Sequence, residues 1–274
     1  MQKFALVFAV LGFAYTATAH NDQIENIAAN DNDQEQKLIN ISHNAFKPGE
    51  RLTYRLTYGV FDAGEATFQV LETKRTVNGR KLWRMYCTGK TVSAFEWFYK
   101  VDDVYESYVD AEALVPWVFK RKVDEGGFKF TQDYVFKQHK NEVETEKGNT
   151  HTVPDQVQDM ISAFYYARTF DFSKAKKGDK FKVNIFLDEE LTPTEIKYLG
   201  KEVVRTRKGK YRCHKFAPVV VEGRIFPSDD AATIYITDDQ NKIPILAKAK
   251  LHFGSVKMHL VRWDGLNNPI AEVK

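Results

Sequence analysis

The sequence predicts an all-β fold with one packed helix, in which a large curved antiparallel sheet or open barrel wraps an aromatic amphipathic helix. Three observations support this fold class. Apolar and polar residues alternate with period two along much of the chain, the turns between these stretches are short, and one segment, residues 153–172, has apolar residues at helical spacing. Strands and helices do not alternate, so an antiparallel sheet is favoured over a parallel one.

The first strands follow from three consecutive alternating stretches. From Arg51 the chain reads RLTYRLTYG, in which the Leu and Tyr residues alternate with Arg and Thr. One face of this strand is therefore buried and the other faces water. Residues 63–73 and 79–88 repeat the pattern, and the three stretches together predict an antiparallel meander.

Residues 92–110 hold a second group of aromatic residues. We expect a short helical or irregular turn in the first half of this segment and a strand in the second half. The clearest hairpin follows at residues 116–137, where Asp124–Gly127 joins two alternating arms and supplies two glycines that accept positive φ. Its large apolar residues are Trp117, Phe119, Val123, Phe128, Phe130, Tyr134 and Phe136.

Strand-like runs resume after the helical segment. Turn residues such as RKGK, DDQNK and FGS separate these runs, and we expect roughly seven to ten strands with short connections. The runs are residues 179–187, 194–206, 211–221, 231–237, 243–252 and 255–262.

The helical segment needs a partner surface. Val157, Met160, Ile161 and Phe164 recur at the spacing of one helix face. We expect Thr152 or Asp155 to cap the helix, with Pro154 in its first turn. Further aromatic residues widen the apolar surface beyond what a solvent-facing helix carries, so the helix is expected to fill the concave face of the curled sheet; these are Tyr165, Tyr166 and Phe170.

A groove between this helix and the sheet could hold a hydrophobic or amphipathic molecule, which motivates the preferred functional hypothesis. The candidate groove residues are Met160, Phe164, Tyr165, Arg168, Tyr105 and Trp117. The alternative is a protein that binds or hydrolyses cell-wall glycan. In that alternative Trp97, Tyr105 and Trp117 would be stacking platforms, and Glu106 or Asp103 would be the acid. The two hypotheses differ in whether those rings are exposed beside a carboxylate.

The N-terminal residues predict export. Lys3 precedes an apolar run over residues 4–15, and Ala17 and Ala19 form an A-x-A site, so residues 1–19 are expected to be a signal peptide cleaved after Ala19. The apolar run is shorter than the roughly 20 residues that a membrane-spanning helix needs. We therefore expect a periplasmic protein with no transmembrane segment in its mature chain.

The mature chain divides into a leader and one domain. Residues 20–44 are rich in Asn, Asp and Gln, which predicts a flexible polar leader. Residues 45–274 contain no linker-like composition and are expected to form a single β-rich domain. The formal net charge of +3, one unit of which leaves with Lys3, is too small to indicate nucleic-acid binding.

The two cysteines, Cys87 and Cys213, lie in strand-like surroundings. Export permits a disulfide between them, but two separate buried thiols are the simpler expectation. No G-x-S-x-G, G-x-x-x-x-G-K-[ST] or H-E-x-x-H motif is present and the histidines are scattered. The sequence therefore favours a non-catalytic protein without metal or cofactor and leaves an enzymatic role open. A lipid and an envelope protein are the candidate partners.

Seven blocks of the chain resemble a known bacterial family. They are FKPGERLTYRLTYG, FYKVDDVYESYVD, PWVFKRKVDEGGF, QDMISAFYYAR, GKYRCHKFAPVVVEG, ITDDQNKIP and FGSVKMHL. In this order, from about Phe46 to about Leu260, they are similar to the family called domain of unknown function 3108. The resemblance implies an exported envelope protein of a Gram-negative bacterium with one domain and no established activity. It assigns no catalytic residues.

Overall fold

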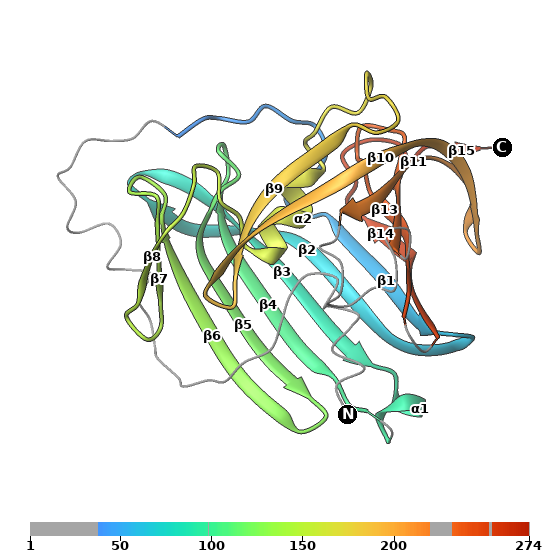
Figure 1. Cartoon of the computed structure of the whole chain (residues 1–274), viewed down its shortest axis with the longest axis horizontal. Coiled ribbons are helices and arrows are strands. Elements are labelled where there is room, and N and C mark those ends of the chain that lie inside the picture. The colour runs from blue at the N-terminus through green and yellow to red at the C-terminus, as the bar shows by residue number, and fades with distance from the viewer. Residues whose placement is uncertain (1–37, 98, 220–231, 252–253, 274) are drawn as a thin grey trace.

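The computed structural model describes residues 38–97, 99–219, 232–251 and 254–273. Its main feature is one 15-stranded antiparallel sheet, most of whose strands run in the order β8-β7-β6-β5-β4-β3-β2-β1-β14-β13-β12-β11-β10-β9, with β15 paired to β11 (Figure 1). The predicted signal peptide and most of the leader lie outside the described residues. The predicted fold class is confirmed.

The strands of the first half are β1 (Arg51–Tyr58), β2 (Phe61–Val77), β3 (Arg80–Thr91), β4 (Asp102–Asp110), β5 (Pro116–Glu125), β6 (Phe128–Lys137), β7 (Glu142–Thr145) and β8 (Thr150–Thr152). Those of the second half are β9 (Lys180–Leu187), β10 (Glu190–Thr206), β11 (Gly209–Val219), β12 (Ala232–Thr237), β13 (Pro244–Lys250), β14 (Ser255–Asp264) and β15 (Glu272–Val273). The helices are α1 (Ser93–Glu96) and α2 (Met160–Ala167).

The fifteen strands exceed the expected seven to ten, and three of them were missed because short strands carry too little alternation to be recognised. The missed strands β7, β8 and β15 are two to four residues long. Hydrogen bonds to a longer neighbour define these strands. The long strands and the hairpin of β5 and β6 match their prediction, with Gly126 and Gly127 at φ 58° and 88° in the turn.

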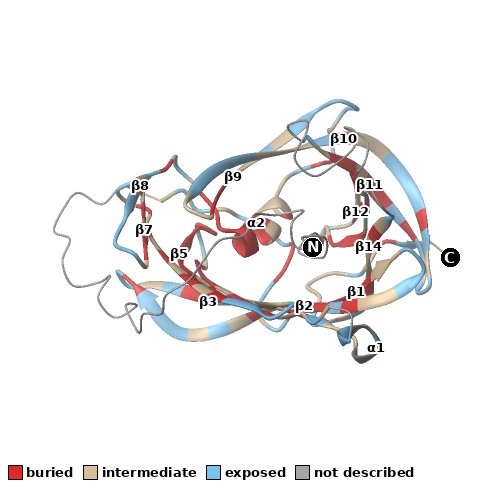
Figure 2. Ribbon diagram, turned by 60° about the horizontal axis from the view of Figure 1, so that its bottom comes forward, coloured by how far each residue is buried: buried red, intermediate tan, exposed pale blue. Residues whose placement is uncertain are grey.

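Two meanders meet at the centre of the sheet. β1 to β8 lie side by side in chain order, β9 to β14 do the same, and β1 pairs with β14 to join the two sets. The outer strands β8 and β9 do not pair with each other, so the barrel is open. Figure 2 shows the two halves of the sheet curling around α2.

Side chains from the β9–β10 turn cross the open side. Asp188 is ion-paired with Arg121 on β5, and the amide of Glu189 donates to the Tyr134 hydroxyl over 3.1 Å. Lys147 also binds the Glu189 carboxylate at 2.6 Å. Together with the backbone bridge between Gln158 and Ile185 of β9, these contacts close the barrel on this side in place of a strand ladder.

The core lies between α2 and the sheet. Residues from both meanders pack in one cluster, in which the buried face of α2 contributes Met160, Ile161, Ala163 and Tyr165. Burial within β1 follows the expected alternation except at Thr53: Leu52, Tyr54 and Leu56 are buried, and Thr53 on the other face is buried too. The helix thus fills the concave face of the sheet as predicted, because its apolar surface is covered on the sides that face β3, β4 and β9.

The last residues of the predicted leader contact the domain. The amide of Ile41 donates to the Glu112 carbonyl over 2.8 Å, and the Asn40 side chain bonds Glu112 and Arg80. Leu38 packs against a small cluster on the other face of the sheet. Leu38, Asn40 and Ile41, within the range predicted as leader, therefore contact the fold.

Candidate functional site

The helix α2 begins at a buried carboxylate. The Asp159 side chain accepts hydrogen bonds from the amides of Ile161 and Ser162 at 2.7 and 2.8 Å, while the Ser162 hydroxyl accepts from the Asp159 amide at 2.9 Å. This reciprocal pattern is a capping box. The Ser107 hydroxyl of β4 donates to the same carboxylate, so the cap also ties the helix to the sheet.

The predicted caps Thr152 and Asp155 are therefore wrong. The helical spacing starts at Val157, but Gln158 and Asp159 are extended, since Gln158 bridges to Ile185 of β9 and Asp159 has φ −87° and ψ 177°. The sequence D-x-x-S at Asp159 carried the signal for the true cap. The pKa of Asp159 is raised to about 6, chiefly by burial. Its hydrogen bonds oppose this shift, because they favour the charged form.

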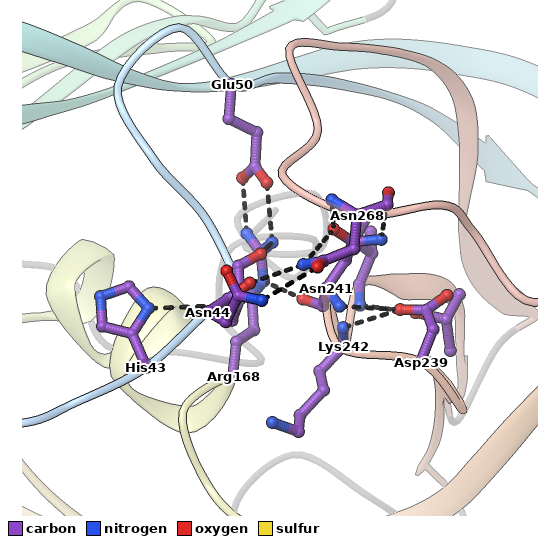
Figure 3. A network of polar contacts seen from close by, with 11 residues as sticks. His43, Asn44, Glu50, Arg168, Asp239, Asn241, Lys242 and Asn268 are labelled. Atoms are coloured by element: carbon purple, nitrogen blue, oxygen red, sulfur yellow. Dashed lines mark hydrogen bonds and ion pairs between the residues drawn. The ribbon is translucent and has the colours of Figure 1, made fainter.

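The other end of the helix holds a buried cation. The Arg168 guanidinium binds both carboxylate oxygens of Glu50 at 2.6 and 2.8 Å and donates to the carbonyls of Ala45 and Asn241 at 3.0 Å each (Figure 3). Both charged side chains are almost completely buried. Arg168 therefore joins the end of α2, the segment before β1 and the β12–β13 turn.

Aromatic rings surround the same guanidinium. Its central carbon lies 5.1 Å from the ring centroid of Phe46, 5.5 Å from that of Tyr165 and 6.0 Å from that of Phe164. Such distances are within the range of cation–π attraction. Each of the three guanidinium nitrogens of Arg168 donates at least one hydrogen bond, and the charge of the Glu50 carboxylate is balanced by the guanidinium.

A cluster of amide side chains lies around this ion pair (Figure 3). The Asn241 amide donates to the carbonyls of Asn268 and Pro269 at 2.9 and 3.2 Å. Asn44 donates to the side chains of Gln240 and Asn268 at 2.7 and 3.0 Å. The cluster joins the segment before β1 to the segment after β14 and to the β12–β13 turn.

Two further basic residues adjoin the cluster. Burial, together with the charges of Arg168 and Lys242, lowers the pKa of His43 to about 4, so the imidazole is neutral at pH 7. Burial also lowers the pKa of Lys242. The arrangement holds together the segment before β1, the β12–β13 turn and the segment after β14.

The candidate groove residues separate into two groups. Met160, Tyr165 and Tyr105 belong to the main core and Arg168 is buried beside them, while Phe164 is partly buried and stacks on Phe68 at 4.5 Å. These five residues are close-packed around α2.

Trp117 lies on the opposite face of the sheet. It packs with Val77, Leu82, Tyr108 and Val118, and its indole N–H donates to Asp110 over 3.4 Å. Because Trp117 is two residues from Phe119, alternation predicts that both side chains lie on the same face. A register shift between β4 and β5 beside Trp117 breaks this alternation and places the indole on the other face. The predicted groove therefore does not include Trp117.

The rings of the glycan hypothesis are also dispersed. Tyr105 and Trp117 are buried, and Trp97 is exposed. Glu106 is ion-paired with Arg84 at 2.9 Å, and Asp103 is buried. No cleft that combines the three rings with an acid is formed by these residues.

Cys87 and Cys213 are unpaired and buried. They lie on β3 and β11, which β2, β1, β14, β13 and β12 separate in the sheet order, so the possible disulfide is not formed. Burial raises the pKa of both thiols, that of Cys213 to about 12. Neither is activated as a nucleophile.

Over the described part of the chain, no group of three or more His, Cys, Asp or Glu side chains is placed to hold a metal ion. Nor does any helix there have the length and apolarity required to span a membrane.

Comparison with known proteins identifies the family. Residues 53–261 match the family described as Protein of unknown function (DUF3108). The chain belongs to this DUF3108 family. No curated protein matches it.

Two solved structures of other families resemble this DUF3108 chain. One is the crystal structure of a beta-barrel-like protein of domain of unknown function DUF1849 from Brucella abortus, with TM-score 0.52 and 12% identity over 80% of this chain and 98% of that one. The other is a DUF1089 family protein from Pseudomonas aeruginosa, with TM-score 0.32 and 10% identity over 77% of this chain and 95% of that one. The first supports a barrel-like fold for the DUF3108 domain.

Sequence reasoning found Arg168 but not its counter-ion. Glu50 lies in a turn segment, PGER, where a surface carboxylate is the ordinary expectation. It also missed an acidic pair, Asp103 and Glu125, because these residues are distant in sequence and meet only through the pairing of β4 with β5.

Proposed function

We propose that this protein is an exported, non-catalytic protein of the bacterial envelope that docks on the surface of a phospholipid bilayer. The observation that carries the proposal is a set of four exposed apolar side chains at one end of the barrel, here called the apolar rim. Their exposed fractions are Val60 88%, Phe61 64%, Trp97 86% and Phe128 45%.

The topology places these side chains together. The connections β1–β2, β3–β4 and β5–β6 all lie at the same end of six adjacent antiparallel strands. Val60 and Phe61 are in the first connection and its strand start, Trp97 follows α1 in the second, and Phe128 begins β6 after the third. In Figure 1 the β5–β6 turn, α1 and the β1–β2 turn follow one another along the lower edge.

The residue types suit a membrane interface. Tryptophan is favoured at the level of the lipid headgroups, and apolar side chains that penetrate the acyl boundary contribute binding in proportion to their buried area. Scattered single apolar residues on a surface need no explanation. Four of them at the tips of three neighbouring connections at one end of the sheet favour insertion into a common plane.

Charges beside the apolar rim are of both signs. Lys90 pairs with Asp102 at 3.3 Å, and Lys129 pairs with Asp124 at 3.0 Å. The rim therefore has little net charge, and we expect its attachment to depend on apolar insertion more than on attraction to anionic headgroups. Binding should then change little with salt concentration.

The support for export is the N-terminal sequence, with Lys3, the apolar run and the Ala17–Ala19 site. The original hypothesis of a groove around α2 is less well supported than the rim, because Met160, Tyr165, Arg168 and Tyr105 are buried among neighbours.

The experiment is co-sedimentation of the purified mature chain with vesicles of phosphatidylethanolamine and phosphatidylglycerol. The wild type should sediment, and the variant Phe61→Asp/Trp97→Asp should lose at least about tenfold in partition, on the scale expected for removing large apolar side chains from a lipid interface. The partition of the wild type onto vesicles should differ by less than about threefold between low and high salt concentration.

The matched control is Val203→Asp. Val203 is also exposed and apolar, but it lies near the β10–β11 turn, at the opposite end of the barrel. This variant should bind as the wild type does. The proposal is overturned when the wild type does not sediment with vesicles, or when the double rim variant sediments as well as the wild type.

A further inference from the structure

Two acidic side chains meet at the base of the apolar rim. Asp103, at the start of β4, is fully buried. Its carboxylate accepts from the Asp124 amide at 3.0 Å and from the Tyr105 hydroxyl at 3.2 Å. It is also hydrogen-bonded to the side chain of Glu125, at the end of β5. Two carboxyl groups can share such a bond only when one of them carries a proton.

The proton belongs on Glu125. Burial is the largest cause that raises the pKa of Glu125 to about 7, and the charge of Asp103 is the next. The pKa of Asp103 is raised as well, again chiefly by burial. Hydrogen bonds from the Asp124 amide and Tyr105 favour its charged form. The pair therefore titrates as a unit.

The other groups that face the pair do not replace this proton. Tyr99 is hydrogen-bonded to Glu125, and burial raises the pKa of this phenol to about 12. The charge of Arg121 on β5 favours ionisation of Glu125, while that of Asp102 opposes ionisation of Asp103. The nearby Cys87 thiol of β3 is neutral, because burial raises its pKa.

The pair lies where two parts of the rim join. The Gly126 amide of the β5–β6 turn donates to the Lys100 carbonyl over 2.7 Å, and Val101 forms an isolated bridge with Glu125. The Tyr99 ring packs so closely on Gly126 that an added Cβ there would lie 2.6 Å from it. These contacts attach the connection that carries α1 and Trp97 to the turn that precedes Phe128.

We propose that the proton shared by Asp103 and Glu125 is a switch that controls the arrangement of the apolar rim. When the pair is protonated, its hydrogen bond holds residues 99–103 against the β5–β6 turn, a contact here called the clasp. When both carboxylates are charged, the clasp loosens. As regulation of the docking surface, this inference rests on the proposed function. The opening itself is a property of the chain and can be measured without a membrane.

The sign follows from the direction of the shift. Because the folded-state pKa of Glu125 is raised above its ordinary value, the protonated clasp is fully formed at low pH and weakens as the pH rises toward and through about 7. Above that range the fully buried charge of Asp103 faces the half-buried charge of Glu125. Repulsion between them then separates residues 99–103 from the β5–β6 turn.

The test is hydrogen exchange of the full mature chain between pH 5.5 and 8.5, corrected for the intrinsic pH dependence of exchange. The reporting amides are those of Asp124 and Gly126, which donate into the clasp. In the wild type their protection should fall by about tenfold or more across this range, while amides in the centres of β1 and β2 keep theirs. A wild type with constant protection at these amides overturns the switch.

Glu125→Gln is the informative variant. The Gln amide can donate to the Asp103 carboxylate at every pH, so protection should stay high with no transition. Asp103→Asn should also remove the transition, and it serves if the first variant does not fold. Glu96→Gln, which alters an exposed carboxylate on α1, should keep the wild-type transition. A wild-type transition that persists in both clasp variants contradicts the proposal.

Because this readout contains no lipid, its failure is distinct from failure of the docking proposal. If the exchange transition is present but the chain binds vesicles equally at pH 5.5 and 8.5, the clasp exists and does not regulate docking.

Discussion

Arg168 and Glu50, 118 positions apart in the chain, form a two-pronged ion pair with contacts of 2.6 and 2.8 Å in the interior of the barrel. Arg168 ends the only long helix of the described residues, and Glu50 immediately precedes β1. The pair thus fixes the helix relative to the strand at which the two meanders join.

Breaking this pair should destabilise the protein strongly. We expect Arg168→Met and Glu50→Gln each to lower the free energy of unfolding by about 3–5 kcal/mol, because each leaves a buried partner without its counter-charge or hydrogen bonds. The double variant should lose clearly less than the sum. Urea denaturation of the four proteins measures this, and strictly additive losses would show that the two side chains are not coupled.

The helix cap should respond to pH. Burial raises the pKa of Asp159 to about 6, so the wild type loses stability as the pH rises from about 4 through 6, by up to about 3 kcal/mol. Asp159→Asn keeps an acceptor for the capping amides and does not titrate, so its stability relative to the wild type should increase over this interval.

Asp159→Ala is the matched variant, because it removes the cap as well as the charge. At pH 4 it should be less stable than Asp159→Asn by about 1 kcal/mol or more. Thermal unfolding at several pH values tests both statements. An Asn variant whose stability follows that of the wild type at every pH would contradict the raised pKa.

The two thiols should be unreactive in the folded protein. Cys87 and Cys213 are buried and unpaired, and their raised pKa values leave little thiolate at pH 8. A thiol reagent such as DTNB should therefore react with neither in native buffer and with both in denaturant. An intact mass lower by two hydrogens would instead reveal a disulfide.

The interior should hold no stoichiometric lipid. Five of the six candidate groove residues are buried and Phe164 is stacked on Phe68, so packing leaves their surfaces covered by protein. Native mass spectrometry of the gently purified chain should give the mass of the chain alone. A bound acyl-chain species, confirmed after organic extraction, would restore the groove hypothesis at the expense of the apolar rim.

The sequence determined the class of fold because alternation is a local property of each strand. Leu52, Tyr54 and Leu56 are two residues apart, and burying one face of that strand satisfies them in any antiparallel sheet. The helix around Met160 and Ile161 was likewise recognisable from its spacing, and several blocks of residues sufficed to place the chain in its family.

Only the tertiary structure decided which residues meet. The register of β4 against β5 placed Trp117 on the outer face and brought Asp103 to Glu125. The pairing of β1 with β14 placed Glu50, which precedes β1, beside Arg168 at the end of α2. A local pattern specifies which face of an element is apolar. Its partner is selected by the free energy of the whole assembled sheet, to which residues more than a hundred positions away contribute.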